Sequence, residues 1–256
     1  GEHVVAGISL GEEHGGLSID WEMRLDPESW LVDSIQASSL TTSHFASQLS
    51  SPEPATFSVG LQFPEELRQM LLCAVEARRE EAINNAEDEG GRHVVEQLFK
   101  TAQATAEAGK LDLFGQMIGE PPERLVFVGG LAISGDDVLA QTLAEVLPYA
   151  ANAPQVAELD MNVGQAGNVA IHRVVPTEMR EQERRLYGDD AAFYFGVGDG
   201  AVWLGVGEDH ALDVLTEVIT NRDSGVASSE GEPHFRFSLH LSDWVVLGDS
   251  LGDGSE

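Results

Sequence analysis

The chain has 256 residues, 42% of them apolar, which is enough to bury the core of one large domain or two modest ones. Its charge is far from balanced, because 44 acidic and 14 basic residues give a formal net charge of −30. Such a surface repels nucleic acid and anionic membranes, so we expect neither as a partner. An acidic surface is typical of proteins in saline surroundings. It could also bind divalent cations if several oxygen ligands converge on one point.

The first predicted element is a hairpin. Residues 3–25 alternate between apolar and polar side chains around a glycine-rich turn, which predicts two paired strands with one wet face. Residues 33–55 are rich in Ser and Thr and are expected to form a loop. A strand is predicted at residues 55–61.

Two helices are predicted next. Pro64-Glu65-Glu66 opens the first, because proline is tolerated in a first turn and the helix dipole favours acids there. Cys73, the only cysteine, lies in this helix and is expected to be a small buried hydrophobe rather than a reactive thiol. The stripe that this helix should bury consists of Leu67, Leu71, Ala74, Val75 and Ala82. The stripe of the second helix, which should end at Gly109, consists of Val95, Leu98, Phe99, Ala102 and Ala106.

Strands and helices follow in mixed order. Strands are expected at 111–118, 125–128, 156–163 and 168–175, and helices after Ser134, at 178–187 and at 211–219. Asp199-Gly200, between two apolar runs, is the strongest hairpin signal in the chain. The pattern predicts an α+β fold, with an antiparallel or mixed sheet and helices packed on one face.

Two stretches of the chain are similar. Residues 50–63 (SSPEPATFSVGLQF) and 228–241 (SSEGEPHFRFSLHL) both run from a Ser-Ser pair into a strand with Phe-Ser-x-x-Leu. This similarity suggests an internal duplication. In that interpretation residues 1–256 are a single α+β region cut from a longer repetitive protein. The complete unit would span about 57–232, and residues 1–56 and 233–256 would be partial units.

The duplication makes a prediction about side chains. In equivalent strands the same alternate residues should point into the core, while Ser58 and Ser238 face the other way. The residues expected to be buried are Phe57, Val59 and Leu61 in one strand, and Phe237, Leu239 and Leu241 in the other.

One motif near the C-terminal end suggests an enzyme. Gly248-Asp249-Ser250-Leu251, preceded by Val245-Val246-Leu247, resembles the nucleophile block of GDSL-type esterases, where an apolar strand delivers the serine. The Gly-x-Asn-Asp and Asp-x-x-His blocks of that family do not occur in this sequence. The spacing of Trp244, Leu247 and Leu251 fits a helix beginning after Ser242-Asp243 equally well. An ester hydrolase with Ser250 as nucleophile is therefore the alternative function.

Other short motifs fail on their context. Asp223-Ser224-Gly225 lacks the apolar strand and the second copy that an aspartic protease needs. The glycines from Gly130 to Gly135 have the spacing of a phosphate loop, but two aspartates stand where Lys and Ser or Thr must bind phosphate. The segments 11–14 (GEEH) and 207–210 (GEDH) each place two acids beside a histidine. Adjacent residues of a strand point to opposite faces and so could not bind one ion together, and acids are favoured at a helix N-terminus without a metal. His234 and His240 have no recognisable ligand spacing. We therefore assign no catalytic, cofactor-binding or metal-ligating residue.

Three segments carry a resemblance to a known group of proteins. They are residues 106–112 (AEAGKLD), 125–137 (LVFVGGLAISGDD) and 186–208, which begins LYGDD and ends VWLGVGE. Over residues 60–241 the order of elements is similar to that of large, uncharacterised exported proteins of planctomycete bacteria. That resemblance implies export to the periplasm or cell surface, with a signal outside this sequence, and it implies no known activity.

The function expected from the sequence is a non-catalytic structural or interaction segment of an exported, acidic cell-envelope protein. Its partner would be an unknown protein or envelope component, and no cofactor is expected. A calcium-dependent envelope module is a further alternative, in which divalent cations are the ligands. The sequence contains no run of eighteen apolar residues and so predicts no membrane-spanning helix.

Overall fold

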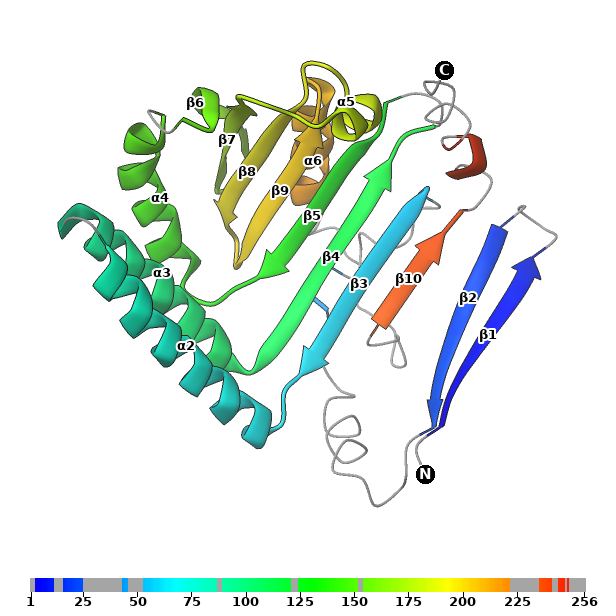
Figure 1. The fold of residues 1–256 in the computed structure, drawn as a ribbon, viewed down its shortest axis with the longest axis horizontal. Coiled ribbons are helices and arrows are strands. Elements are labelled where there is room, and N and C mark those ends of the chain that lie inside the picture. Colours follow the sequence, from blue (N-terminus) through cyan, green and yellow to red (C-terminus); the bar gives the residue numbers. More distant parts are fainter. Residues whose placement is uncertain are drawn as a thin grey trace.

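The computed structural model describes residues 3–11, 16–24, 43–45, 53–86, 89–120, 124–151, 154–221, 235–240, 244–246 and 248. These residues form an eight-stranded antiparallel sheet, a separate two-stranded hairpin, and helices beside the sheet (Figure 1). The α+β architecture predicted from the sequence is confirmed.

The hairpin consists of β1 (His3–Gly11) and β2 (Gly16–Arg24), as its alternating pattern predicts. The large sheet has the strand order β10-β3-β4-β5-β9-β8-β7-β6. Its strands are β3 (Ala55–Gln62), β4 (Lys110–Ile118), β5 (Val126–Ala132), β6 (Val156–Ala166), β7 (Val169–Pro176), β8 (Ala192–Gly198), β9 (Ala201–Gly207) and β10 (Phe235–Leu239). The helices are α2 (Glu65–Asn85), α3 (Glu89–Ala108), α4 (Asp136–Ala150), α5 (Glu181–Tyr187) and α6 (His210–Asn221).

The β8–β9 connection is the tight turn that its sequence indicates. Asp199 and Gly200 both adopt left-handed backbone conformations, with φ of 54° and 74°. Positive φ at both central residues matches the twist of the strands that the turn joins, which explains the preference for Asp-Gly. The turn is tied to α4, because the backbone N–H of Gly200 donates to Oδ2 of Asp136 at 3.0 Å. Asp136 is therefore a structural hydrogen-bond acceptor rather than part of a phosphate loop.

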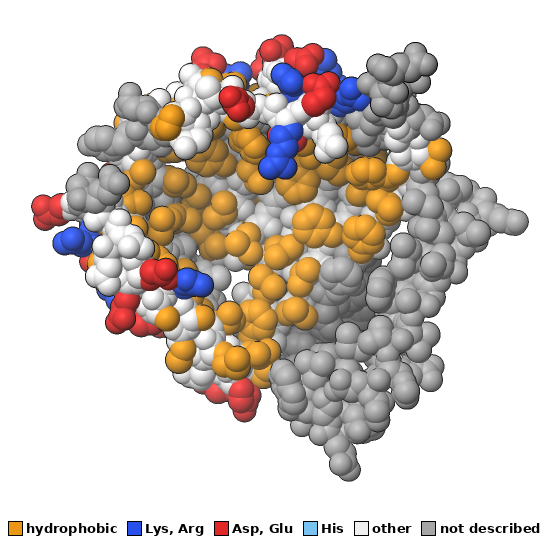
Figure 2. Space-filling model, in the orientation of Figure 1, with side chains coloured by type: hydrophobic (Ala, Val, Ile, Leu, Met, Phe, Trp, Pro, Cys, Tyr) orange, Lys and Arg blue, Asp and Glu red, His pale blue; other side chains and the backbone are white. Residues whose placement is uncertain are grey.

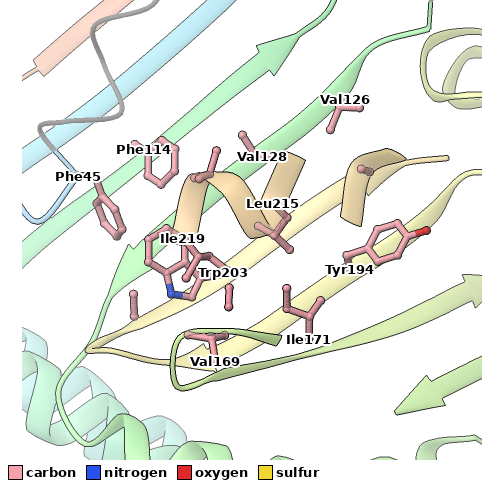
Figure 3. Close-up of a cluster of buried hydrophobic side chains, with 14 of the residues drawn as sticks. Phe45, Phe114, Val126, Val128, Val169, Ile171, Tyr194, Trp203, Leu215 and Ile219 are labelled. Atoms are coloured by element: carbon pink, nitrogen blue, oxygen red, sulfur yellow. The ribbon is translucent and has the colours of Figure 1, made fainter. Parts of the chain in front are cut away.

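The hydrophobic core lies on the face of the sheet that α6 covers (Figures 1 and 3). Trp203 and Tyr194 project from β9 and β8 toward Leu215 of α6, and all three are fully buried. The short segment 43–45 packs against the same face of the sheet and contributes Phe45 to the core. Its Phe45 packs edge-on against Trp203 at 5.3 Å between ring centroids.

Asp112 of β4 anchors that segment. Its side chain is fully buried and accepts hydrogen bonds from Oγ of Ser43 at 2.7 Å and from the backbone N–H of His44 at 2.5 Å. Nζ of Lys110 lies 3.2 Å from the same carboxylate. A buried carboxylate needs such partners, and these hold the 43–45 segment against the sheet.

The expected burial of α2 is wrong. Helices α2, α3 and α4 lie side by side at one end of the sheet, and α2, the outermost, packs mainly against α3 (Figure 1). No described residue of α2 is buried, and Leu71 and Ala74 of the predicted stripe are exposed. Cys73 is also exposed, so it is not the buried hydrophobe that its apolar neighbours suggest. Because α2 packs mainly against one helix and not against the sheet, its apolar stripe is only partly covered.

Candidate functional site

The face of the sheet opposite α6 carries a continuous apolar surface. Residues paired across antiparallel strands point to the same face, so the ladders from β3 to β7 define which side chains share it. We call this surface the open face. Its residues are Ala55, Phe57, Val59, Leu61, Leu111, Leu113, Gly115, Met117, Phe127, Gly129, Leu131, Val202, Leu204, Val206, Phe193, Phe195, Val197, Ala170, His172 and Val174. Not one of these twenty residues is an acid, a lysine or an arginine, and Figure 2 shows the apolar side chains spread over the middle of the molecule.

Helix α4 contacts β8 and β6, and Val197, Val206 and His172 of the open face are buried, at 6%, 7% and 7% exposure. Other large side chains of this face are in contact with solvent. Phe193, Leu131 and Leu204 are 38%, 38% and 37% exposed, although they come from the three central strands β8, β5 and β9. Phe237 of β10, opposite Phe57, is 46% exposed. Single exposed apolar residues are ordinary, but a contiguous apolar patch across a sheet marks an interaction surface.

Two glycines keep the open face low between β3 and β5. The rings of Phe57 and Phe127 lie over Gly115, where an added methyl group would collide with the Phe57 ring. Gly129, the cross-strand partner of Gly115, lies below the same Phe127 ring. The two rings therefore lie against the backbone, which leaves a broad surface of low relief.

At β3 the burial is the reverse of that predicted from the duplication. Thr56 and Ser58 are only 4% and 6% exposed, whereas Phe57 is partly exposed. This is the α6 side of β3, where the segment 43–45 is anchored to β4 through Asp112 and lies close to β3 at Gly60. The polar side of β3 is thus covered, and its apolar side belongs to the open face.

His172 is the one titratable residue on the open face. Its ring lies beside that of Phe195, with 5.5 Å between centroids, and it is 7% exposed. Nδ1 accepts a hydrogen bond from the backbone N–H of Asn162 at 3.3 Å, at an irregularity in the β6–β7 pairing where Asn162 has a φ of 56°. Burial lowers the pKa of His172 below its usual range. These contacts give His172 a structural role, as the neutral partner of the β6 bulge.

The structure describes only part of the segment that carries the esterase motif, residues 244–246 and 248. Ser250 lies outside the described residues, as do His14, Asp223 and His234. Residues 244–246 are helical, and the indole N–H of Trp244 donates to the carbonyl of Pro54 at 3.0 Å. The valines that an esterase would need in a strand are thus in helical conformation, which agrees with the alternative interpretation of that segment.

One of the two acids before His210, Glu208, forms an ion pair. Arg124 forms ion pairs with Glu208 and with Asp189, the latter at 3.3 Å. Glu208 therefore connects the start of α6 to the segment before β5. In the described part of the chain, no three His, Cys, Asp or Glu side chains come close enough together to hold a metal ion.

A shallow pocket lies beside α5. It is lined by Glu181, Gln182, Arg185 and Leu186. The carboxylate of Glu181 is already engaged, at 2.9 Å from Arg184 and 3.2 Å from Arg185. Hydrogen bonds from Arg185 and Arg184 lower the pKa of Glu181, as in any exposed ion pair. The lowered pKa makes this carboxylate a weaker base than an unpaired one.

The sequences of β8 and β9 contain a signal for an apolar second face, although they do not show the alternation expected of a strand with one face in water. Strands β8 (AFYFGVG) and β9 (AVWLGVG) are apolar at nearly every position. A strand with one wet face alternates, whereas a nearly continuous apolar run indicates that both faces are covered. Only the structure shows that α6 covers one of the two faces, and that on the other face α4 contacts β8 but leaves Phe193 and Leu204 in contact with solvent.

Comparisons with known protein families, with curated proteins and with solved structures found no match. The described helices include none that is both long and apolar enough to span a membrane.

Proposed function

We propose that this chain is a non-catalytic interaction segment of an exported, acidic cell-envelope protein, and that it binds through the open face. The observation that carries the proposal is the absence of charge from this surface. The chain has 44 acidic residues, yet six adjacent strands present none of them on this side. A solvated acidic face would serve a monomer better, so the composition favours a covered surface.

The energetics support the same conclusion. Burying apolar surface yields about 25 cal/mol per Å². Phe193, Leu131 and Leu204 retain more than a third of their surface in water, so covering them stabilises whatever complex does so. These three side chains are not part of the main core, which Trp203, Tyr194 and their neighbours form under α6.

Export and the envelope setting rest on the resemblance carried by residues 106–112, 125–137 and 186–208. These segments form the end of α3 and the start of β4, the β5–α4 connection, and the α5–β9 region. They are scaffold features, and they support a shared architecture rather than a shared activity. The non-catalytic part of the proposal rests on the open face and not on the resemblance.

Cell fractionation tests the proposal. The protein is expressed in its source organism with Leu204→Asp and Phe193→Asp, and the matched control carries Met70→Asp, at a 66% exposed position on α2. The unaltered and control proteins should co-fractionate with the envelope, and the face variant should be released. The proposal would be contradicted if the unaltered protein were found in the cytoplasm, or if the protein with both aspartate substitutions remained in the envelope fraction. Hydrolysis of short acyl esters that Ser250→Ala abolishes would assign the hydrolase instead.

A further inference from the structure

The two similar stretches of the sequence form neighbouring strands. β3 carries Phe57-Ser58 and β10 carries Phe237-Ser238, and the two strands pair antiparallel at one side of the large sheet (Figure 1). Without β10 the sheet would end at β3 on this side and at β6 on the other. β10 thus lies on the strand whose sequence it resembles.

The register of this pair is two-fold symmetric about the shared motif. Phe57 lies opposite Phe237, and Val59 lies opposite Phe235. A residue two positions after one motif phenylalanine therefore faces the residue two positions before the other. When the two motif phenylalanines are equated, a two-fold axis between them exchanges the strands. Each strand meets the other as it would meet a copy of itself.

Main-chain hydrogen bonds show which groups hold β10 on β3. The backbone N–H of His240 donates to the carbonyl of Pro54 at 3.0 Å, so these two residues are a hydrogen-bonded pair. Hydrogen-bonded and non-hydrogen-bonded pairs alternate along an antiparallel ladder. The N–H of Ser238 therefore points to β3, opposite Thr56, whereas the N–H of Leu239 points to the other side of β10.

Neither strand brings an acid to this contact. β3 (ATFSVGLQ) has no charged residue and β10 (FRFSL) has one basic residue, although the chain has a net charge of −30. Proteins commonly protect an exposed edge strand with charged side chains, and β3 lacks them, as expected of a strand that is always covered. Two β3 strands in the observed register would place Phe57 opposite Phe57 and Thr56 opposite Ser58, with no pair of like charges.

We propose that the edge of β3 is a docking site for a Phe-Ser-x-x-Leu strand, and that this pairing joins two units of a repetitive protein. In this chain β10 occupies the site. The partner is the equivalent strand of a neighbouring unit, added antiparallel in the same register. In strand addition the main-chain hydrogen bonds supply affinity and the alternate side chains supply selectivity. The site is the edge of the sheet, so the inference goes beyond the proposed function of the open face.

Peptide binding to the full chain tests the docking site. Ser238→Pro removes the N–H that points to β3 and should release β10, whereas Leu239→Pro removes an N–H that points away and should leave β10 in place. A fluorescein-labelled peptide of residues 233–241 should bind the Ser238→Pro protein, as measured by fluorescence anisotropy. Binding to the unaltered and Leu239→Pro proteins should be at least about tenfold weaker, because their tethered β10 competes at high effective concentration.

Two unlabelled peptides test the selectivity of the site. The peptide of residues 53–61, which has the sequence of β3, should compete with the labelled peptide, and a scrambled peptide of residues 233–241 should not. The proposal is overturned if a folded Ser238→Pro protein binds no peptide, if residues 53–61 do not compete, or if the scrambled peptide competes equally well. Circular dichroism shows whether the variants are folded.

Disulfide trapping tests the same site without a proline substitution. In a Cys73→Ser background, chains with Phe57→Cys are mixed with chains with Phe237→Cys and exposed to oxidised glutathione. The two cysteines would form a non-hydrogen-bonded pair, which brings them close enough for a disulfide. A disulfide-linked dimer of the two different chains is expected, and Ser238→Cys in place of Phe237→Cys should not form one, because its side chain points to the opposite face. Equal cross-linking by both mixtures, or none by either, would overturn the proposal.

Discussion

Phe57 and Phe237 lie directly opposite each other in the antiparallel pair β3–β10. They come from the two stretches whose similarity suggested an internal duplication, and each is the Phe of a Phe-Ser-x-x-Leu strand. As cross-strand partners they point to the same face, which the duplication requires. That face is open, however, so the predicted burial of Phe237 is wrong, since it is 46% exposed. The duplication itself stays a prediction.

Gly115 is predicted to tolerate a side chain poorly because the Phe57 ring lies over it. A methyl group at residue 115 would collide with the Phe57 ring, so Gly115→Ala should destabilise the fold by about 1–3 kcal/mol, the usual range for overpacking. Adding Phe57→Ala should remove much of that effect, so the double variant should be less destabilised than the sum of the single variants. Urea unfolding of the four proteins measures this difference.

Gly60 supplies the control for Gly115. It lies on β3, the strand paired with the β4 strand of Gly115, and a methyl group there meets only Cβ of Ser43, at 3.9 Å, which is an ordinary contact. Gly60→Ala should therefore be neutral or slightly stabilising. Equal losses at the two positions would show that the collision with Phe57 is not the cause.

Asp112 is predicted to be the most sensitive acid among the described residues. Asp112→Ala removes the acceptor of Ser43 Oγ and of the His44 N–H, and leaving such donors unpaired costs about 1–3 kcal/mol each. Asp112→Asn keeps one acceptor oxygen and should lose less. Asp213, an exposed acid on α6, provides the comparison, and Asp213→Asn should stay within about 0.5 kcal/mol of the unaltered protein in urea. An Asp112→Ala variant as stable as Asp213→Asn would show that the 43–45 anchor contributes nothing.

The elements could be predicted because their signals are local. Asp199-Gly200 requires positive φ at two residues, and the strand pairs have alternating or continuous apolar runs, so the hairpin and the strands follow from the sequence alone. Which face is covered depends on segments far away in the chain. Thr56 and Ser58 are buried on the side where residues 43–45 are tied to Asp112 of β4. No periodicity within β3 contains this information.

The open face could not be predicted for the same reason. Trp203 and Leu204 are neighbours in an apolar run, yet one is fully buried under α6 and the other is 37% exposed. The run shows that both sides of β9 are apolar, but only the position of α6 decides which side is core. The exposure of Cys73 is a similar case, because α2 lies outside α3.

His172 predicts a dependence of stability on pH. Burial lowers its folded pKa below the unfolded value of about 6.5, so in that window the unfolded chain binds more protons than the folded one. This contribution to stability is present above about pH 6.5 and is lost as the pH falls toward the folded pKa. The stability advantage of the unaltered protein over His172→Gln should therefore shrink from pH 7 to pH 5, as measured by urea unfolding.

Asn162→Gly controls for the bulge around His172. Glycine tolerates the positive φ at residue 162 and leaves the imidazole in place, so this variant should keep the pH dependence of the unaltered protein. If His172→Gln retains the same dependence, the acid sensitivity belongs to the carboxylates and not to His172.

The net charge predicts that salt stabilises the monomer. With 44 acidic and 14 basic residues, most acids have no cation to pair with, and their mutual repulsion disfavours the compact state. Between about 0.01 and 0.5 M NaCl the screening length falls from about 30 Å to a few ångströms, so the melting temperature should rise across this range. Measurement at about 1 µM keeps any concentration-dependent association from contributing to the melting temperature. A flat or falling melting temperature would show that the acids are already paired or ion-bound.

Calcium at matched ionic strength provides the comparison with NaCl. A melting temperature higher in calcium than in NaCl would require specific binding of calcium to the native state and would favour the calcium-dependent alternative.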